Sequence, residues 1–369
     1  MQFIDLQRQY ERIKETLNPK LQKVLSSCKF ILGPEVEELE KRLAEYVGRK
    51  YCVSCSSGTD ALLMPLLAWG IGKGDAIFTT PFTFIATSEV IRLVGATPVF
   101  VDIEPKTFNI DSSKLEEAIE KVVRDGKLKP KAIIPVDLFG LPANYSKILE
   151  IAKKYKLLVL EDAAQGFGGA INGSKACSFG EVSATSFFPA KPLGCYGDGG
   201  AVFTDDDELY ELLVSIRVHG QGKDKYENVR LGINGRLDTL QSVVLLAKMD
   251  IFDEELQLRN NIAEKYSKLL SGKVETPYVP EGFFSCWAQY SVLAENEDHR
   301  KEILERLRQK GIPTAIYYPI PLHLQKVNSD LGYKYGDFPV SEAISKRIFS
   351  LPMHPYLKDD EIELIASSI

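Results

Sequence analysis

Residues 185–200 read Thr-Ser-Phe-Phe-Pro-Ala-Lys-Pro-Leu-Gly-Cys-Tyr-Gly-Asp-Gly-Gly and place one lysine, Lys191, between two prolines. Because Pro189 and Pro192 fix backbone torsions and lack amide donors, Lys191 cannot lie inside a regular helix. An aromatic, strand-like segment precedes the prolines, and a glycine-rich turn follows them. Taken alone, this pattern is typical of an ordinary loop lysine, but it also suits an ammonium group held at a defined place.

A second stretch gives this lysine a partner. Residues 157–165 read Leu-Leu-Val-Leu-Glu-Asp-Ala-Ala-Gln, an apolar strand that ends in a carboxylate. A pyridoxal-phosphate cofactor needs an amine for its aldehyde and an anion for its ring nitrogen. Lys191 and Asp162 supply those groups, so the two stretches together predict such an enzyme. Without Lys191, Asp162 would be interpreted as the N-cap of a following helix.

The composition is that of an ordinary globular protein. Lys and Arg number 45 against 51 Asp and Glu, a net charge of −6, and no basic run favours nucleic acid as a partner. The N-terminus does not resemble a signal peptide, and the longest apolar stretch, residues 61–71, contains Pro65 and is too short to cross a bilayer. We therefore expect no membrane partner and a cytoplasmic location.

Cysteine usage agrees with a reducing compartment, because the six cysteines are scattered along a long chain. Cys52 and Cys55 form a C-x-x-C pair, but no second pair or neighbouring histidine completes a zinc site. We interpret both as small buried hydrophobic residues and expect no metal.

Short apolar strands alternate with amphipathic helices through most of the chain. The expected strands cover residues 51–55, 76–84, 98–103, 132–137 and 157–160. The expected helices cover residues 5–25, 34–47, 61–69, 86–94, 113–124, 145–155, 207–218, 238–270, 297–310 and 340–349. This alternation predicts an α/β fold with a mostly parallel sheet covered on both faces. We expect a large domain over residues 1–250 and a smaller α+β domain over residues 251–369.

Candidate ligand-binding residues follow several of these strands, and in parallel sheets ligands collect at the carboxyl ends of the strands. The turn Ser56–Thr59 opens a helix, whose free amides and positive dipole end suit an anion, although a plain N-cap would look the same. Phe82 or Phe84 could stack on a planar cofactor or belong to the core. We expect the turn, Phe82, Asp162 and Lys191 to lie at one edge of the sheet.

Five motifs resemble those of the DegT/DnrJ/EryC1/StrS sugar aminotransferases, and the resemblance covers essentially the whole chain. They are Ser57-Gly58-Thr59, Glu161–Gln165, Ser186–Lys191, Gly197–Gly200 and Gly232–Arg236. The resemblance implies a pyridoxal-phosphate enzyme of fold type I, the aspartate-aminotransferase fold. One branch of the family has histidine in place of the lysine and performs dehydration, whereas this chain keeps Lys191.

The resemblance also implies roles for individual residues. Lys191 would form the Schiff base and shuttle a proton, Asp162 would pair with the ring nitrogen, and Gln165 would lie near the phenolic oxygen. The remaining cofactor contacts would be Ser57, Gly58, Thr59 and Ser186 at the phosphate, Phe82 on one ring face, and Asn234 from the neighbouring subunit of a homodimer with shared active sites. Arg236, Tyr317 and Tyr318 would contact the sugar nucleotide or the amino donor.

The implied reaction has two halves. An amino donor, L-glutamate as in relatives, would convert the cofactor to pyridoxamine phosphate, and a keto group on a nucleotide-linked sugar would then take the nitrogen. Residues 187–200 and 231–238 look most like the enzymes that aminate UDP-2-acetamido-3-keto-glucuronate for bacterial surface polysaccharide such as O-antigen. Arg236 is the candidate partner of the uronate carboxylate.

Two kinds of alternative stay open. The substrate could be a neutral dTDP- or UDP-keto-deoxysugar aminated at C3 or C4. The same fold also serves as a non-catalytic effector-binding module in regulators, but residues 1–25 are too short for a DNA-binding domain. An NAD-dependent enzyme would need a G-x-G-x-x-G after the first strand, and the chain has none there.

Overall fold

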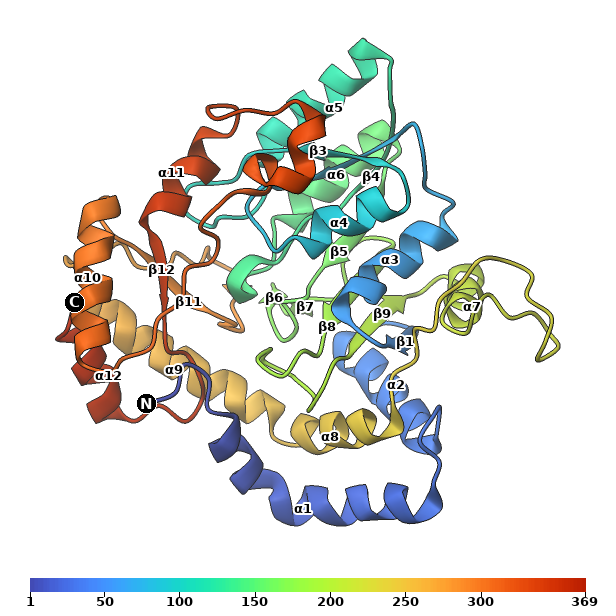
Figure 1. Cartoon of the computed structure of the whole chain (residues 1–369), viewed down its shortest axis with the longest axis horizontal. Helices are drawn as coiled ribbons and strands as arrows, with labels where there is room; N and C mark the ends of the chain where they lie inside the picture. The colour runs from blue at the N-terminus through green and yellow to red at the C-terminus, as the bar shows by residue number, and fades with distance from the viewer.

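A seven-stranded sheet runs through the centre of the molecule in the computed structural model, which describes all 369 residues (Figure 1). Its strand order is β1-β9-β8-β5-β4-β2-β3. Only β9 runs against its neighbours, and the other pairs are parallel. The strands are β1 (Tyr51–Cys55), β2 (Asp75–Thr79), β3 (Thr97–Phe100), β4 (Lys129–Ile133), β5 (Leu158–Asp162), β8 (Val182–Ser186) and β9 (Gly200–Thr204). The predicted mostly parallel α/β sheet is confirmed.

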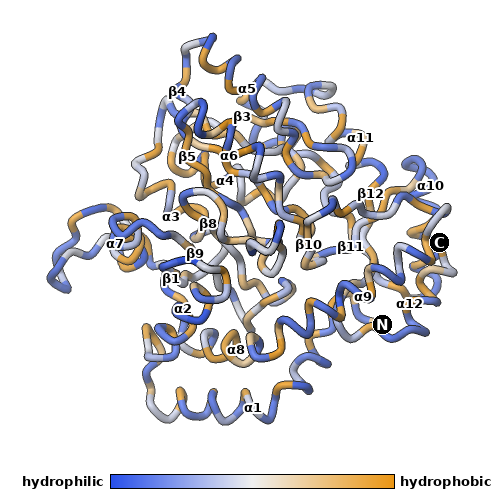
Figure 2. Tube along the Cα trace, turned by 180° about the vertical axis from the view of Figure 1, so that it is seen from behind, coloured by the Kyte–Doolittle hydropathy of each residue, from blue (hydrophilic) through white to orange (hydrophobic).

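Helices cover both faces of the sheet, which is why its strands are continuous apolar runs rather than alternating ones. One face packs against α3 (Gly58–Ala68), α4 (Ala86–Leu93) and α7 (Asp207–Ile216). The other packs against α2 (Pro34–Val47), α5 (Ser112–Asp125), α6 (Tyr145–Tyr155) and α8 (Thr239–Met249). Figure 2 shows the resulting pattern, with hydrophobic residues concentrated in the central strands and hydrophilic ones on the outer turns. No helix combines the length and the apolar character that a membrane crossing requires.

The cysteines of the C-x-x-C pair lie in two different cores. Cys52 packs in the cluster beneath α2 and α8, whereas Cys55 packs in the cluster beneath α3. Both thiols are free and buried. They behave as the small hydrophobic residues that the sequence predicts.

The N-terminal helix α1 (Leu6–Ser27) lies along α8 on the outside of the molecule (Figure 1). Its buried residues Ile13, Leu17 and Val24 pack against Val243 and its neighbours on α8. Asp5 caps the helix, since its side chain accepts a hydrogen bond from the Arg8 amide at 2.9 Å. As a result α8 is enclosed between α1 and the core.

The prediction of one long helix over residues 238–270 is wrong. The chain forms α8 and α9 (Phe252–Leu270), separated by a break at Asp250–Ile251, where Ile251 has φ −118° and ψ 0°. Helix α8 is buried on nearly all sides, whereas α9 is buried along one stripe only. The two parts therefore have different surroundings, and the axis turns where they meet (Figure 1).

Other boundaries also differ from the predictions. The strands expected over residues 76–84 and 98–103 are β2 and β3, which end at Thr79 and Phe100. The helix expected over residues 340–349 is α11 (Pro339–Arg347), and the chain continues directly into the strand β12 (Ile348–Leu351). The strand expected over residues 132–137 is β4, which ends at Ile133, and beyond it only Val136 forms an isolated bridge, to Asp162. At each boundary the chain is apolar and partly β-branched, as in Ile348-Phe349 and Ile133-Ile134, so local pattern alone does not fix where the element ends.

The C-terminal part is built on β11 (Tyr290–Leu293) and β12, which pair antiparallel, with α10 (Glu297–Gln309) and α12 (Asp359–Ala366) beside them. A core cluster there draws only on residues 262–366. A small sheet of β6 (Ala170–Ile171), β7 (Ser174–Lys175) and β10 (Phe283–Phe284) joins sequence-distant segments. Three short 3-10 helices complete the chain at Leu138–Gly140, Leu322–Leu324 and Lys326–Leu331. The division at residue 250 stays a prediction.

Candidate active site

Lys191 lies on a tightly folded loop between β8 and β9. The Phe187 amide donates to the Gly199 carbonyl at 2.7 Å, the Cys195 amide to Phe187 at 2.8 Å, and the Lys191 amide to Phe188 at 2.8 Å. The loop needs glycine at position 194, because a Cβ there would lie 2.6 Å from the carbonyl oxygens of Phe188 and Pro189. The loop is thus a fixed support for its lysine.

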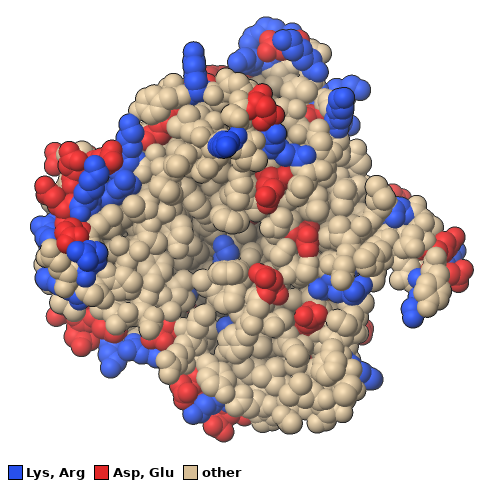
Figure 3. Space-filling model, in the orientation of Figure 1, with Lys and Arg blue, Asp and Glu red and all other residues tan.

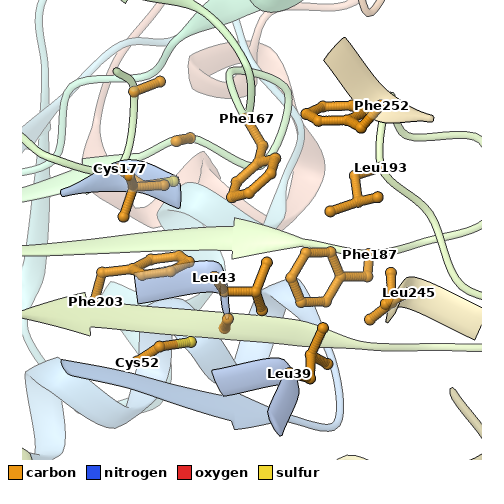
Figure 4. Close-up of a cluster of buried hydrophobic side chains, with 14 of the residues drawn as sticks. Leu39, Leu43, Cys52, Phe167, Cys177, Phe187, Leu193, Phe203, Leu245 and Phe252 are labelled. Atoms are coloured by element: carbon orange, nitrogen blue, oxygen red, sulfur yellow. The ribbon is translucent and has the colours of Figure 1, made fainter. Parts of the chain in front are cut away.

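Apolar side chains of the same loop reach into the core. Figure 4 shows Phe187 and Leu193 beside Phe167, Leu39 and Leu245, in the cluster under α2 and α8. Burial of these two side chains contributes roughly 1.5–3 kcal/mol each relative to exposure. These two side chains therefore anchor the loop to the core, while Lys191 stays half-buried.

The Lys191 side chain forms no hydrogen bond or ion pair within the chain. The nearby Asp162, in contrast, accepts two hydrogen bonds. Burial lowers the pKa of Lys191, and the charge of Asp162 opposes that shift. A lowered pKa makes the neutral amine, which is the nucleophilic form, easier to reach. Lys191 is thus available to react with a carbonyl group.

Asp162 is the last residue of β5 and is almost fully buried. Its Oδ2 accepts from the Thr87 hydroxyl at 2.8 Å, and its Oδ1 accepts from the Ala164 amide at 3.2 Å. Neighbouring side chains on a strand point to opposite faces, and Glu161 accordingly turns away to accept from the amides of Cys177 and Phe179. Burial raises the pKa of Asp162, while these hydrogen bonds and Lys191 hold it down.

Gln165 connects the β5 edge with the C-terminal part of the chain. Its Oε1 accepts from the Phe139 amide at 2.8 Å, and its Nε2 donates to the Tyr318 hydroxyl at 2.9 Å. Tyr317 is half-buried next to Tyr318, with ring centroids 5.8 Å apart. The structure therefore brings Gln165 and Tyr318 together, as the sequence predicts for one site.

The turn after β1 and the end of β8 meet closely. A Cβ on Gly58 would lie 2.6 Å from Cβ of Ser186, and one on Gly200 would lie 2.4 Å from the Ser57 carbonyl oxygen. Ser57 caps α3 by accepting from the Asp60 amide at 3.1 Å, and Thr59 lies in the first helical turn. Backbone amides of a helix N-terminus and the Ser186 hydroxyl thus border one cradle, which suits a phosphate.

Phe82 and Phe84 differ sharply in exposure. The Phe82 side chain is 0% exposed and lies edge-on to the rings of Phe108, Phe139 and Tyr318, whereas Phe84 is 56% exposed. Phe84 also precedes Thr87 by one turn, since the Thr87 amide donates to the Phe84 carbonyl at 3.3 Å. Of the two rings, Phe84 is the exposed one, and its residue lies one helical turn before Thr87, the donor to Asp162.

The segment with Asn234 and Arg236 lies beside the cradle. The Ser56 amide donates to the Gly235 carbonyl at 3.1 Å. Asn234 is exposed, while Arg236 is partly buried and its Nε has no hydrogen-bond partner. A guanidinium held without a partner suits an anionic ligand.

A hollow opens near the centre of the face shown in Figure 3, with Lys or Arg atoms on its floor, and charges of both signs mix around it. A groove of about 810 Å³ lies elsewhere, between β3, α5 and residues 331–339. Its lining mixes Lys114 and Lys121 with Glu117 and Asp125 and includes none of the residues above. The chemistry, rather than the volume, identifies the candidate active site.

Sequence reasoning did not single out Thr87, although it donates directly to Asp162. Thr87 follows Phe84 within a helix-forming pattern, so its position gives no signal without the fold. Asp162, Gln165, Tyr318 and Lys191 come together around one place, and Ser57, Gly58 and Ser186 meet at the neighbouring cradle.

These residues fit pyridoxal phosphate by their own chemistry: an unpartnered lysine, a buried carboxylate and a cradle of amides that a Cβ would fill. Such a site on a mostly parallel sheet defines the class of enzymes that hold this cofactor on a lysine. The chain belongs to the DegT/DnrJ/EryC1/StrS aminotransferase family, whose model matches residues 11–369.

Individual relatives extend over the full length. The UDP-2-acetamido-2-deoxy-3-oxo-D-glucuronate aminotransferase of Pseudomonas aeruginosa is 46% identical, covering 100% of this chain and 99% of the relative. The crystal structure of a DegT DnrJ EryC1 StrS aminotransferase from Brucella abortus is 50% identical, with a TM-score of 0.96, covering 100% of this chain and 98% of that one. The PMP-form of the sugar aminotransferase Spr1654 from Streptococcus pneumoniae is 27% identical, with a TM-score of 0.89, covering 96% and 94%.

Proposed function

We propose that this aminotransferase moves an amino group from L-glutamate to the 3-keto carbon of UDP-2-acetamido-2-deoxy-glucuronate, in the synthesis of bacterial surface polysaccharide. The observation that carries the proposal is that Lys191, which has no hydrogen bond or ion pair, lies close enough to the buried Asp162 for each charge to act on the pKa of the other. The full-length likeness to an enzyme named for that 3-oxo-glucuronate supports the substrate.

When bound, pyridoxal phosphate supplies a carbonyl that condenses with amines and a ring that accepts negative charge. Lys191 Nζ would hold the cofactor covalently through its aldehyde and, as a free amine, would move a proton at the substrate carbon. Asp162 would keep the ring nitrogen protonated, because its anionic oxygens lie in a partly dry site. Thr87 fixes the orientation of that carboxylate.

Three further groups would orient the cofactor. Ser186 and the amides of Ser57, Gly58 and Thr59 would bind the phosphate, and Gln165 would lie at the phenolic oxygen. Phe84, whose ring is exposed and which lies three residues before Thr87, would cover the ring face expected for Phe82. Phe82 would then support Tyr318 from the core.

A homodimer would complete the site. The arm, residues 219–232, extends from α7 away from the rest of the chain (Figure 1). Tyr226 is 88% exposed and Leu231 is 89% exposed on it, and such apolar exposure suits a subunit interface. Asn234 follows the arm and would reach the phosphate of the partner subunit. Replacing Tyr226 and Leu231 with serine is expected to weaken dimerisation, as measured by sedimentation.

Arg236 is the proposed partner of the uronate carboxylate. The test measures 2-oxoglutarate formed from glutamate with UDP-2-acetamido-3-keto-glucuronate and with a neutral UDP-keto-sugar. Arg236→Met is expected to raise KM for the uronate roughly tenfold or more and to change the neutral substrate little. The exposed Arg308, paired with Glu305 on α10, provides the matched control Arg308→Met. An equal loss with both sugars in Arg236→Met, or a wild-type enzyme that prefers the neutral sugar, would contradict the uronate assignment.

A further inference from the structure

A second lysine is attached to the loop that carries Lys191. Lys248, on α8, is 1% exposed, and its Nζ donates to the Gly194 carbonyl at 2.5 Å. Gly194 lies three residues after Lys191, in the part of the loop where a Cβ has no room. The contact therefore acts on the backbone that sets where Lys191 emerges.

Helix α8 holds this loop at two points. The Gln241 side chain accepts from the Tyr196 amide at 2.8 Å, two residues beyond the carbonyl that Lys248 binds. The Lys248 ammonium also lies 4.5 Å from the centroid of the Tyr196 ring. On its other side Tyr196 meets Tyr10 of α1, with centroids 6.4 Å apart. The buried cation thus joins α8 to the loop, and the Tyr196 ring joins the loop to α1.

A buried ammonium without a salt-bridge partner costs free energy of desolvation, so stability alone does not explain Lys248. The titratable groups near it are Glu255 on α9 and the Cys195 thiol, whose pKa burial raises to about 11, and neither forms an ion pair with it. Its one hydrogen bond goes to the loop backbone. A leucine or methionine would fill the same space without that cost.

We propose that Lys248 is a positioning residue for Lys191, holding the Gly194 carbonyl so that the lysine-bearing loop keeps one conformation during turnover. The inference rests on the proposed function, since it assumes that Lys191 carries the cofactor. Near an active site, a misplacement of about 1 Å can cost on the order of 10²-fold in rate. The anchor would therefore act on kcat more than on the binding of the substrate.

This anchor is titratable near neutral pH. Burial lowers the pKa of Lys248 to about 8, and the nearby Glu255 and Cys195 work against that shift. The Tyr196 ring also faces the ammonium, and burial raises the pKa of its hydroxyl to about 12. Above this pH the amine still donates, but a neutral donor makes a hydrogen bond roughly half as strong as a charged one. The profile of kcat should then fall on the alkaline side near that pKa.

The experiment compares wild type, Lys248→Met and Lys175→Met as cofactor-loaded enzymes. Lys175 is a matched control, because its Nζ lies 3.2 Å from the centroid of the Tyr46 ring but touches no part of the Lys191 loop. Lys248→Met is expected to keep its cofactor band, to lose about tenfold or more in kcat with little change in KM, and to lack the alkaline fall. Lys175→Met is expected to match wild type.

A second variant separates the hydrogen bond from the charge and serves if Lys248→Met does not fold. Lys248→Gln keeps a neutral donor and should show a smaller loss of kcat without the alkaline fall near the pKa of Lys248. If Lys248→Met, or Lys248→Gln where the first does not fold, has the kcat and the pH profile of wild type, the proposal is overturned. If the wild-type enzyme itself shows no lysine-linked cofactor band, the proposed function fails instead, and the two failures are thereby distinguished.

Discussion

Replacing Gly58 with alanine tests the cradle where α3 and β8 meet. The new Cβ would lie 2.6 Å from Cβ, 3.0 Å from Oγ and 3.3 Å from Cα of Ser186. Carbon atoms prefer about 3.5–4.0 Å, so one side must move by about 1 Å. Rotation of the Ser186 side chain gives no relief, because its Cβ and Cα belong to the strand.

Neither side moves freely. Helix α3 is held by its buried residues Ala61, Leu62 and Met64, and Ser186 is paired with Gly200 of β9. Such overpacking costs roughly 1–3 kcal/mol, from which alanine recovers about 0.5–1 kcal/mol through its better helix propensity. We expect a net loss of about 1–2 kcal/mol in the free energy of unfolding.

The effect on the cofactor should be larger than on the fold, since both displaced elements would hold its phosphate. We expect Gly58→Ala to weaken pyridoxal-phosphate affinity about tenfold or more, measured by titrating the cofactor band, with thermal melts of the cofactor-free protein alongside. Gly72→Ala is the matched control, because its Cβ would meet only the Val94 carbonyl oxygen at an ordinary 3.5 Å. Unchanged affinity and melting in Gly58→Ala would refute the reasoning.

Two other substitutions give separate tests. Asp162→Asn should lower kcat by about 10²-fold or more, measured by steady-state turnover. Burial raises the pKa of Asp162, so between about pH 4 and that raised pKa the folded protein binds more protons at this residue than the unfolded one. The free energy of unfolding therefore falls as the pH rises through this range. In the cofactor-free Asp162→Asn protein, denaturant melts between about pH 4 and about pH 7 should not show this fall. Tyr318→Phe removes the acceptor of Gln165 Nε2 and should cost about 1 kcal/mol in unfolding free energy, whereas Tyr278→Phe, which has no side-chain hydrogen bond, should cost almost nothing. An unchanged kcat in Asp162→Asn, or equal losses in the two tyrosine variants, would contradict these roles.

The fold was predictable because its signals are local. The helices over residues 34–47 and 145–155 match α2 and α6 at both ends, since a first-turn proline opens one and an asparagine cap opens the other. The break between α8 and α9 was not predictable in this way. Both halves keep helical periodicity, and only the packing of α1 and the core around α8 sets the turn at Asp250.

The site residues that lie at strand ends or within sequence motifs were predictable. Asp162 ends one strand and Lys191 follows another, so the parallel topology alone places them at one edge. Phe82 and Phe84 lie two residues apart in a loop without periodicity, and exposure separates them only in the structure. Lys248 sits within an apolar helical pattern, where a lysine is ordinarily interpreted as solvent-exposed.

The absorbance spectrum of the purified enzyme tests the central claim most directly, recorded with pyridoxal phosphate before and after L-glutamate, for wild type and Lys191→Ala. The account predicts a visible band from the lysine-linked cofactor that glutamate converts to a shorter wavelength in wild type, and no such band or conversion in the variant. A wild-type protein that shows no band after cofactor is added, or a variant that behaves like wild type, would contradict the assignment of Lys191.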